Sequence, residues 1–266
     1  MRRLRLSRRS LLVAPAFLPL TPTRATTALE MPIEPCMRLA DPPPDRLVVA
    51  LTLDACPGAF DGRIATALVE SGIAATIFIT DLWLRRNPAG LAYLLAHRDL
   101  FDIENHGELH IPRVIGDRRV YGIPVAGDLV TVRREVARGA TAISIATGAP
   151  PRWYRGATGY YSPPAIPEIE QAGFSIAGYS LNADAGASLP ARSVAARIAN
   201  ATNGEIIVAH INQPGRPSGP GVVAGVRDLQ RRGASFRRLD QLGVTDVDYL
   251  AIASHLPRQV ANHRGS

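Results

Sequence analysis

Short apolar segments alternate with segments of helical periodicity along most of the chain, and this alternation constrains the fold more than any other feature. The clearest apolar segment is 46–53 (RLVVALTL), and a continuous apolar run of this kind is typical of a strand buried on both faces of a parallel sheet. A helical pattern follows it, from a capping Asp61 to about Ser71, and Gly72 ends this pattern.

The same order is repeated as far as residue 239. Further strands are predicted over 73–80, 101–105, 152–155, 174–181, 205–211 and 235–239. Further helices are predicted over 87–97, 128–143, 163–173, 190–201 and 221–232. Because parallel strands need a crossover connection, usually a helix, this order predicts an α/β fold with a parallel sheet or barrel of about seven strands.

The first 25 residues have the features of an export signal. Arg8 and Arg9 precede an apolar stretch over 11–20, and small residues mark possible cleavage points after Ala25 and Ala28. The arginine pair resembles a twin-arginine signal, and an ordinary secretory leader is the alternative. The apolar stretch is too short to anchor the protein stably in a membrane. We therefore expect a periplasmic or secreted protein without stable membrane insertion.

Much of the positive charge of the chain lies in this leader. All 30 basic residues are arginine, and six of them lie in the first 25 residues, which hold no acidic residue. Without the leader, 24 basic residues stand against 23 acidic ones, so the formal net charge falls from +7 to +1. A nearly neutral body has no electrostatic attraction for a polyanion, and no nucleic-acid partner is predicted.

The remaining chain is predicted to form one domain with two flanking segments. Residues 26–45 are a Pro-rich lead-in that we expect to be extended and to lie outside the core. The α/β domain is predicted over 46–242, and 243–266 is a C-terminal tail without a pattern. An exported protein meets an oxidising compartment, so a disulfide between Cys36 and Cys56 and two free thiols are both open alternatives.

Polar residues follow several of the predicted strands at the point where each strand ends. In an α/β barrel the reactive groups lie at the carboxyl ends of the strands, so residues from distant parts of the chain are expected to converge there. Two carboxylates, an arginine and three histidines are a combination typical of metal-assisted hydrolysis. These residues are Asp54, His106, His110, Arg155, Asp184 and His210.

Five segments around these residues resemble, in the same order, the motifs of the polysaccharide deacetylases with a NodB homology domain. These are carbohydrate esterases that remove acetyl groups from N-acetylated sugars. The resemblance covers about residues 46–242 and implies a distorted (β/α) barrel of about seven parallel strands. It also implies a hydrolase whose partner is an acetylated polysaccharide, carrying N-acetyl or O-acetyl groups, and the leader predicts that this hydrolase is exported. The segments are LTLDACPG at 51–58, ENHGELH at 104–110, WYRGATGYY at 153–161, YSLNADAG at 179–186 and EIIVAHINQP at 205–214.

The resemblance implies a catalytic role for four of the strand-end residues. Asp54 matches the general base that activates a water molecule, and Arg155 matches the residue that orients this base. His210 matches the general acid that protonates the leaving group, and Asp184 matches the acid that tunes this histidine.

The resemblance also implies a divalent metal ion, with zinc as the first candidate, held by His106 and His110. The family completes this site with the second aspartate of its TFDDG motif, and here Ala55 stands at that position. If the position is vacant, Ala55→Asp is expected to tighten metal binding. The candidates for a replacement ligand are Asp54, Asp61, Glu104, Glu108 and water.

Two departures from the family pattern keep other functions open. Ala55 removes an expected ligand, and Ala185, where tryptophan is usual, opens one side of the groove. A non-catalytic glycan-binding protein and a hydrolase of a non-sugar amide bond are therefore alternatives to a deacetylase. Three aromatic residues near the motif arginine either stack on sugar rings or fill the core: Trp153, Tyr160 and Tyr161.

Overall fold

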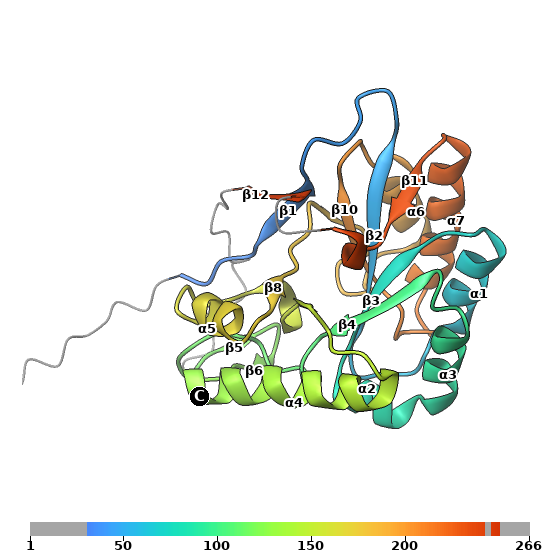
Figure 1. Ribbon diagram of the computed structural model, residues 1–266. Helices are drawn as coiled ribbons and strands as arrows, with labels where there is room; N and C mark the ends of the chain where they lie inside the picture. The colour runs from blue at the N-terminus through green and yellow to red at the C-terminus, as the bar shows by residue number, and fades with distance from the viewer. Residues whose placement is uncertain (1–30, 243–245, 251–266) are drawn as a thin grey trace, which may run out of the picture.

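The computed structural model describes residues 31–242 and 246–250, and Figure 1 shows how its elements are arranged. The predicted export signal and most of the predicted tail lie outside the described residues. Within the described ranges, no helix is both long and apolar enough to cross a membrane.

A parallel sheet of eight strands forms the centre of the fold: β2 (Val48–Ala55), β3 (Ala75–Ile79), β4 (Phe101–Asn105), β7 (Trp153–Tyr154), β8 (Ser175–Ile176), β9 (Leu181–Asn182), β10 (Ile206–His210) and β11 (Ser235–Arg237). Seven strands follow one another in the order β8-β7-β4-β3-β2-β10-β9, and β11 pairs with the first residues of β2. The sheet curls into a half-barrel, and its outermost strands β8 and β9 form no ladder with each other in the described part of the chain. The predicted distorted barrel of about seven parallel strands is confirmed.

Helices connect and flank these strands: α1 (Gly62–Glu70), α2 (Asp81–Arg86), α3 (Pro88–Ala96), α4 (Leu129–Thr147), α5 (Ala165–Gln171), α6 (Ala191–Ala199), α7 (Ser218–Arg231) and the 3-10 turns η1 (Ala157–Gly159) and η2 (Leu239–Gln241). Helix α6 packs along α7, which also contacts α1, so these three helices form one layer beside the sheet. Asp61 caps α1 as predicted, because its carboxylate accepts a hydrogen bond from the Arg63 amide at 3.3 Å.

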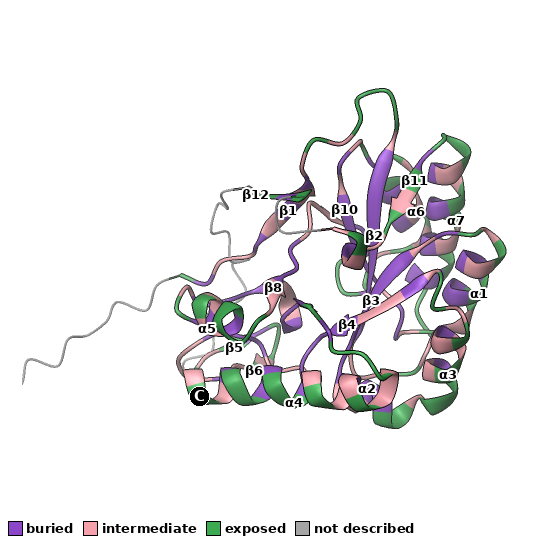
Figure 2. Ribbon diagram, in the orientation of Figure 1, coloured by how far each residue is buried: buried purple, intermediate pink, exposed green. Residues whose placement is uncertain are grey.

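Strand β2 has an apolar outer face and an inner face that becomes polar toward its carboxyl end. Alternate residues of a strand point to opposite faces of the sheet. The outward set, every second residue from Val49 to Ala55, belongs to the core cluster between the sheet and the helices. Both sets are buried, so that β2 is purple in Figure 2. The inward set begins with the apolar Val48 and ends with the polar Thr52 and Asp54. This change of polarity places chemically reactive side chains at one end of the half-barrel.

The Pro-rich lead-in contains a strand, and the expectation that it lies outside the core is wrong. Strand β1 (Cys36–Leu39) pairs antiparallel with β12 (Val247–Leu250), which comes from the predicted tail. Met37 is fully buried in the second core cluster, together with inward residues of β2. Each of these strands has four residues and its partner is distant in the chain, so local sequence patterns do not reveal the pairing.

Both cysteines are free. Cys36 lies in β1, whereas Cys56 directly follows β2 and lines a cavity. Of the two alternatives for this pair, the structure therefore has the two free thiols rather than the disulfide.

The strand predicted over 174–181 is interrupted, and β8 and β9 are its two ends. Between them, the chain passes so close to the lead-in that a Cβ at Gly178 would collide with the Pro35 carbonyl oxygen. The carbonyl oxygens of Ala177 and Gly178 accept hydrogen bonds from the Arg155 side chain. The sequence patterns also missed α2 and the hairpin of β5 (Arg119–Val120) and β6 (Ile123–Pro124).

Candidate active site

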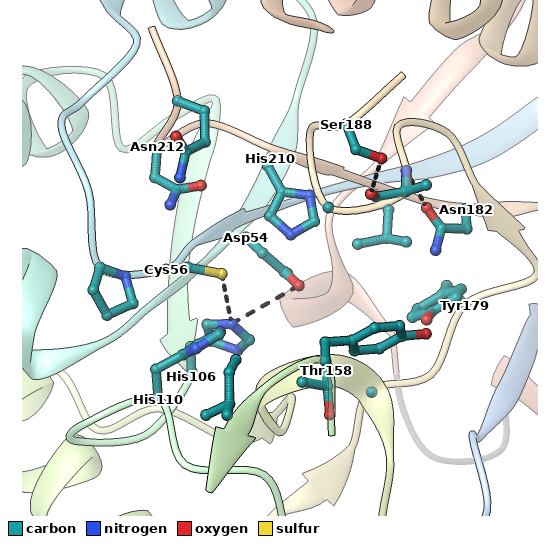
Figure 3. Close-up of a pocket in the computed structure, with 18 of the residues that line it drawn as sticks. Asp54, Cys56, His106, His110, Thr158, Tyr179, Asn182, Ser188, His210 and Asn212 are labelled. Carbon is teal, nitrogen blue, oxygen red and sulfur yellow. Dashed lines mark hydrogen bonds and ion pairs between the residues drawn. The ribbon is translucent and has the colours of Figure 1, made fainter. Parts of the chain in front are cut away.

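A cavity of about 740 Å³ lies at the carboxyl ends of the strands (Figure 3). Its volume falls in the range of small-molecule sites. Strand pairing brings distant residues together here, since His210 on β10 lies in register with Asp54 on β2. Four of the six residues singled out from the sequence line the cavity and two contact them from behind: Asp54, His106, His110 and His210, and then Arg155 and Asp184.

The buried Arg155 guanidinium holds the Asp54 carboxylate. Its Nη1 atom donates hydrogen bonds to Asp54 Oδ1 at 2.9 Å and to Thr52 Oγ1 at 2.7 Å. Its Nε and Nη2 atoms donate to the carbonyl oxygens of Ala177 and Gly178, at 3.2 and 3.1 Å. With its donors fixed on both sides, Arg155 keeps the carboxylate in one orientation. The interruption of the predicted strand over 174–181 therefore leaves two carbonyl oxygens free to accept hydrogen bonds from Arg155.

The Asp54 carboxyl is ionised at neutral pH. Burial raises the pKa of this group, but the neighbouring Arg155 guanidinium, together with His106 and His210, lowers it by more, so the net pKa lies below its ordinary value. The second oxygen, Oδ2, lies 4.0 Å from the Nε2 atom of His106. An ionised carboxylate on the wall of a cavity can accept a proton, which is what a general base must do.

Asp184 fixes the orientation of His210. Its Oδ1 atom lies 2.8 Å from His210 Nδ1, and its Oδ2 atom accepts a hydrogen bond from the His210 amide at 2.7 Å. A carboxylate can only accept, so Nδ1 carries the hydrogen and Nε2 is left for the cavity (Figure 3). Burial lowers the pKa of His210, but the Asp184 carboxylate raises it by more, and the net pKa lies well above its ordinary value. A histidine with a raised pKa is suited to donate a proton.

His106 and His110 come from a tight loop after β4. The backbone turns through positive φ angles at Gly107 (95°) and at His110 itself (63°). Glu135 on α4 holds the loop, because its Oε1 atom accepts a hydrogen bond from the Leu109 amide at 2.8 Å. The centroids of the two imidazole rings lie 5.0 Å apart. A left-handed conformation at a residue other than glycine is strained, and such strain is found preferentially at functional sites.

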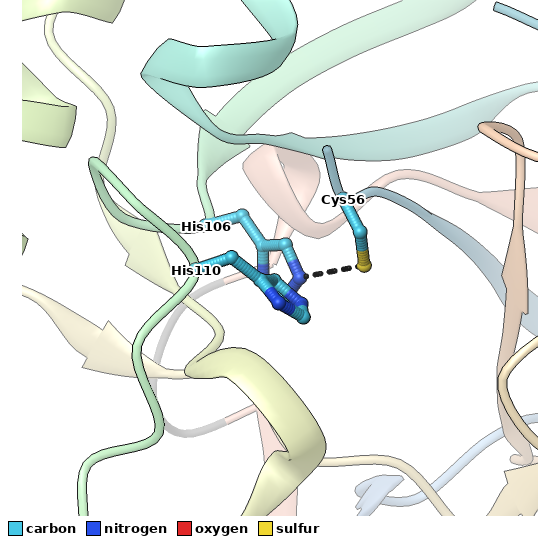
Figure 4. A group of neighbouring side chains, drawn as sticks. All are labelled: Cys56, His106 and His110. Carbon is cyan, nitrogen blue, oxygen red and sulfur yellow. Dashed lines mark hydrogen bonds between the residues drawn. The ribbon is translucent and has the colours of Figure 1, made fainter. Parts of the chain in front are cut away.

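Cys56, which the motif comparison did not single out, lies beside the two histidines (Figure 4). Its Sγ atom is 3.3 Å from Nε2 of His106, and the donor atoms of Cys56, His106 and His110 all lie within 4.8 Å of one another. Burial raises the pKa of the Cys56 thiol, but His110 and His106 lower it by more, and the net pKa lies well below its ordinary value. Thiolate sulfur and imidazole nitrogen are common zinc ligands, so the residues present fit the implied divalent ion.

None of the acidic residues considered as replacement ligands joins this group in the described structure. Asp61 caps α1, and Asp54 is held by the arginine behind it. Glu104 accepts hydrogen bonds from two backbone amides at 2.7 and 2.8 Å. Glu108 forms an ion pair with an arginine of α4 at 3.2 Å. Of the alternatives that the sequence left open, each of the four carboxylates thus has another partner in the described structure, and a water ligand stays a prediction.

The rim of the cavity combines open space with polar and aromatic side chains. Ala185 lines it at the place where a tryptophan was expected. Tyr121, Tyr179 and Glu34 also line it, and the Tyr179 hydroxyl donates a hydrogen bond to the Glu34 carboxylate. The sequence patterns did not identify these three residues. The aromatic residues that were identified fill the core instead, as the second alternative had it: Trp153, Tyr160 and Tyr161.

Comparison with known protein families gives one match. The profile of the polysaccharide deacetylases matches residues 41–177, just over half of the chain. No curated protein matches the chain at a significant level.

Several solved structures share the fold. The Bc1960 peptidoglycan N-acetylglucosamine deacetylase is 20% identical, with a TM-score of 0.62 over 75% of this chain and 89% of that one. The peptidoglycan deacetylase PdaC from Bacillus subtilis is 18% identical, with a TM-score of 0.61 over 74% of this chain and 90% of that one. A CE4 family pseudoenzyme from Bacillus anthracis is 16% identical, with a TM-score of 0.60 over 75% of this chain and 66% of that one, slightly less than two thirds of its length. At these identities the likeness shows the fold.

Proposed function

Because the chain belongs to the polysaccharide deacetylase family, we propose that it is a metal-dependent hydrolase that removes acetyl groups from an N-acetylated or O-acetylated polysaccharide. One observation carries the proposal. A carboxylate with a lowered pKa and a histidine with a raised pKa, Asp54 and His210, stand on neighbouring strands at one cavity. Each is oriented by a buried partner, which a binding protein would not require.

Asp54 is the base of the proposed reaction. It takes a proton from a water molecule, whose oxygen attacks the carbonyl carbon of the acetyl group and forms a tetrahedral intermediate. Arg155 keeps the Asp54 carboxylate ionised and directed into the cavity. Loss of either contribution slows the attack, because the water is a weak nucleophile until its proton is removed.

His210 is the acid of the second step. Its Nε2 proton passes to the leaving nitrogen as the C–N bond of the intermediate breaks, which releases acetate and a free amine. For an O-acetyl substrate the proton goes to the leaving oxygen instead. Asp184 stabilises the protonated form of His210 and fixes its ring. General acid and general base assistance contribute about 10²–10⁴-fold each.

The two histidines opposite these groups are the proposed metal ligands. A divalent ion held by His106 and His110 would polarise the acetyl carbonyl and lower the pKa of an attacking water. The His106 ring is fixed from behind, since its Nδ1 atom lies 2.7 Å from the Arg155 carbonyl oxygen. The backbone of Arg155 therefore positions the metal site, while its side chain positions the base.

The cavity suits a sugar substrate. Tyr121, Tyr179 and Asn212 offer it aromatic surface and hydrogen-bonding groups, a combination that matches the two kinds of surface of a sugar ring. Two of the structural neighbours are peptidoglycan deacetylases, which supports an N-acetylated glycan as the first substrate to test.

The proposal is tested by acetate release from chitin oligomers, peptidoglycan and acetylated exopolysaccharides with zinc-loaded protein. We expect turnover on at least one substrate and its near-complete loss in His210→Ala. His97→Ala is the matched control, because the His97 ring lies against that of Tyr93 and does not line the cavity, and it should keep full turnover. No acetate from any of these substrates would refute the proposal.

A non-catalytic glycan-binding function is the second candidate. The open rim at Ala185 favours it, and so does the presence of a pseudoenzyme among the structures with this fold. It predicts that the protein retains a glycan from the same panel and releases no acetate. A third candidate, hydrolysis of a non-sugar amide, predicts acetate release only from small N-acetylated compounds added to the panel.

We also propose that the protein is exported, with residues 1–25 as its signal. N-terminal sequencing of protein from the native host should find a start after Ala25 or Ala28. Replacing Arg8 and Arg9 with lysine should block export if the twin-arginine route is used. Soluble protein that retains Met1 in the cytoplasm would refute export.

A further inference from the structure

We propose that the thiolate of Cys56 is the third protein ligand of the metal, so that the centre is a Cys-His-His site selective for zinc-like ions over magnesium-like ions. This inference rests on the proposed function, and it changes the chemistry of its metal centre. The family pattern has a carboxylate ligand one position earlier, where this chain has Ala55.

The alternation of side chains along β2 makes position 56 a ligand position and position 55 a core position. The ladder between β2 and β3 continues to the last residue of β2, where Ala55 lies in register with Ile79. Ala55 is therefore held in strand geometry, and its side chain is fully buried in the cluster beneath the helices. Asp54 and Cys56, on either side of it, both line the cavity (Figure 3).

The distances between donor atoms fit a tetrahedral ion. With zinc–sulfur bonds of about 2.3 Å and zinc–nitrogen bonds of about 2.0–2.1 Å, two ligand atoms of a tetrahedral site lie about 3.3–3.6 Å apart. A sulfur–nitrogen pair lies at the upper end of this range, and the Cys56 Sγ to His106 Nε2 distance of 3.3 Å is within about 0.3 Å of it. The donor atoms of all three residues lie within 4.8 Å of one another, and Figure 4 shows both imidazole rings near the Cys56 sulfur.

The tautomer of His106 is already the one that a metal requires. Its Nδ1 atom lies 2.7 Å from the Arg155 carbonyl oxygen. A carbonyl oxygen can only accept a hydrogen bond, so Nδ1 carries the hydrogen and Nε2 presents its lone pair toward Cys56. A backbone carbonyl behind a ligating imidazole is the usual supporting contact in metal sites.

The identity of the ligands determines which ions the site prefers. Three protein ligands leave a fourth position open to the cavity, as in catalytic zinc sites. A thiolate and two imidazoles suit zinc and cobalt, whereas magnesium, calcium and manganese prefer oxygen ligands. A carboxylate as the third ligand would not disfavour magnesium, calcium and manganese in this way.

The experiment uses full-length protein that is stripped with a chelator and reloaded with cobalt(II). A cobalt–thiolate bond gives an intense charge-transfer absorption in the near ultraviolet, which nitrogen and oxygen ligands do not give. Wild-type protein should show this band at one cobalt per chain. Cys56→Ser should lose the band and bind zinc at least about 10-fold more weakly, since even a lost supporting hydrogen bond costs roughly 10–100-fold in metal affinity. Magnesium should not displace the cobalt.

Two further variants make the result specific. Cys36→Ser removes the other cysteine, which lies in β1 outside the cavity, and should keep both the band and the zinc affinity. Cys56→Asp places an oxygen ligand at the same position, and it should bind zinc without the band. If circular dichroism shows that Cys56→Ser does not fold, the presence or absence of the cobalt–thiolate band in Cys56→Asp decides whether Cys56 is the ligand.

The band in Cys56→Ser or Cys56→Asp, or its absence from the wild type, would overturn the inference. Equal zinc affinity of wild type and Cys56→Ser would overturn it as well. The spectrum does not depend on turnover, so failure of the inference and failure of the proposed function are distinguishable. A Cys56-dependent band without acetate release refutes only the function, and acetate release without the band refutes only this ligand set.

Discussion

Replacing Ala55 with aspartate tests the geometry on which the metal site depends. The family pattern suggests that this change restores a ligand, but the structure predicts that it damages the fold. Ala55 has no exposed surface and belongs to a cluster that includes Leu53, Ile64 and Ile79. An aspartate there would place a carboxylate among apolar side chains, with no cation in that cluster to pair with it.

The expected loss of stability is large. A buried charge without a partner costs about 3–5 kcal/mol, and extra atoms in a filled core add about 1–3 kcal/mol. Domains have a free energy of unfolding of about 5–15 kcal/mol, so a loss of this size removes a large part of it. At about 2–4 °C per kcal/mol for a domain of this size, a loss of about 4 kcal/mol, the lower sum of these two contributions, lowers the melting temperature by about 8–16 °C.

The penalty should also depend on pH. Burial raises the pKa of a carboxyl above its unfolded value of about 3.9, so the native state of Ala55→Asp binds more protons than the unfolded state above that pH. Stability then falls as the pH rises, and the deficit relative to wild type should be smaller at low pH than at neutral pH. Urea unfolding of wild type and Ala55→Asp, each at low and at neutral pH, measures how this deficit in stability changes with pH.

Cys56→Asp is the matched control for this measurement. It introduces the same carboxylate one residue later, on the wall of the cavity, where water and two histidines can stabilise the charge. We expect its loss of stability to be about 1 kcal/mol or less, as for substitutions outside the core. If Ala55→Asp were as stable as Cys56→Asp, or bound zinc more tightly than wild type, Ala55 would not face the helices and the argument from strand alternation would be wrong.

Three other outcomes follow from the structure. His210→Ala and Asp54→Asn should each lower turnover by about 10²–10⁴-fold with unchanged circular dichroism. Because acid and base act as a unit, the double variant should lose much less turnover than the product of the two single losses. Near wild-type acetate release by either single variant would contradict the role assigned to that residue. Asp184→Asn removes the charge that raises the pKa of His210, so the alkaline limb of the pH–rate profile should move to lower pH, and an unmoved limb would count against His210 as the acid. Burial and the neighbouring Asp102 raise the pKa of Glu104 above 4.5, so the native state keeps this proton above that pH and loses stability as the pH rises. Glu104→Gln should therefore unfold at a higher urea concentration than wild type at pH 8, and the difference should be smaller at pH 5. An equal difference at both pH values would refute this explanation.

The sequence allowed the order of strands and helices along the chain, and the strand-end residues of the site, to be predicted for a physical reason. Parallel strands all present their carboxyl ends at the same edge, so a polar residue directly after an apolar run is placed without knowledge of the distant contacts. Asp54 and His210 were identified in this way, and the register of β2 and β10 brings them together. Arg155 and Asp184 were identified by the same rule, but their roles behind Asp54 and His210 required the family resemblance, because no local pattern shows which residue a buried arginine or aspartate contacts.

Long-range contacts account for what the sequence did not reveal. The lead-in was expected to lie outside the core because prolines precede its end, yet β1 is buried through its pairing with β12 at the far end of the chain. The strand over 174–181 was predicted as continuous. Its middle is instead diverted by the close approach of Gly178 to Pro35 and by the carbonyl groups that Arg155 requires.

The proposed metal ligand Cys56 was missed for a different reason, since the information was present in the sequence. When the motifs are compared position by position, an aspartate is missing at 55, and the acidic residues nearby become the candidates for its replacement. Alternation along the strand leads to another result, because residues 54 and 56 share one face while 55 belongs to the other. As long as β2 remains paired as far as Ala55, a ligand at 55 would point to the helices, and only 54 and 56 can reach the cavity. A small apolar residue at 55 and a cysteine at 56 are thus two parts of one arrangement, in which the side chain of 55 packs in the core and that of 56 reaches the cavity.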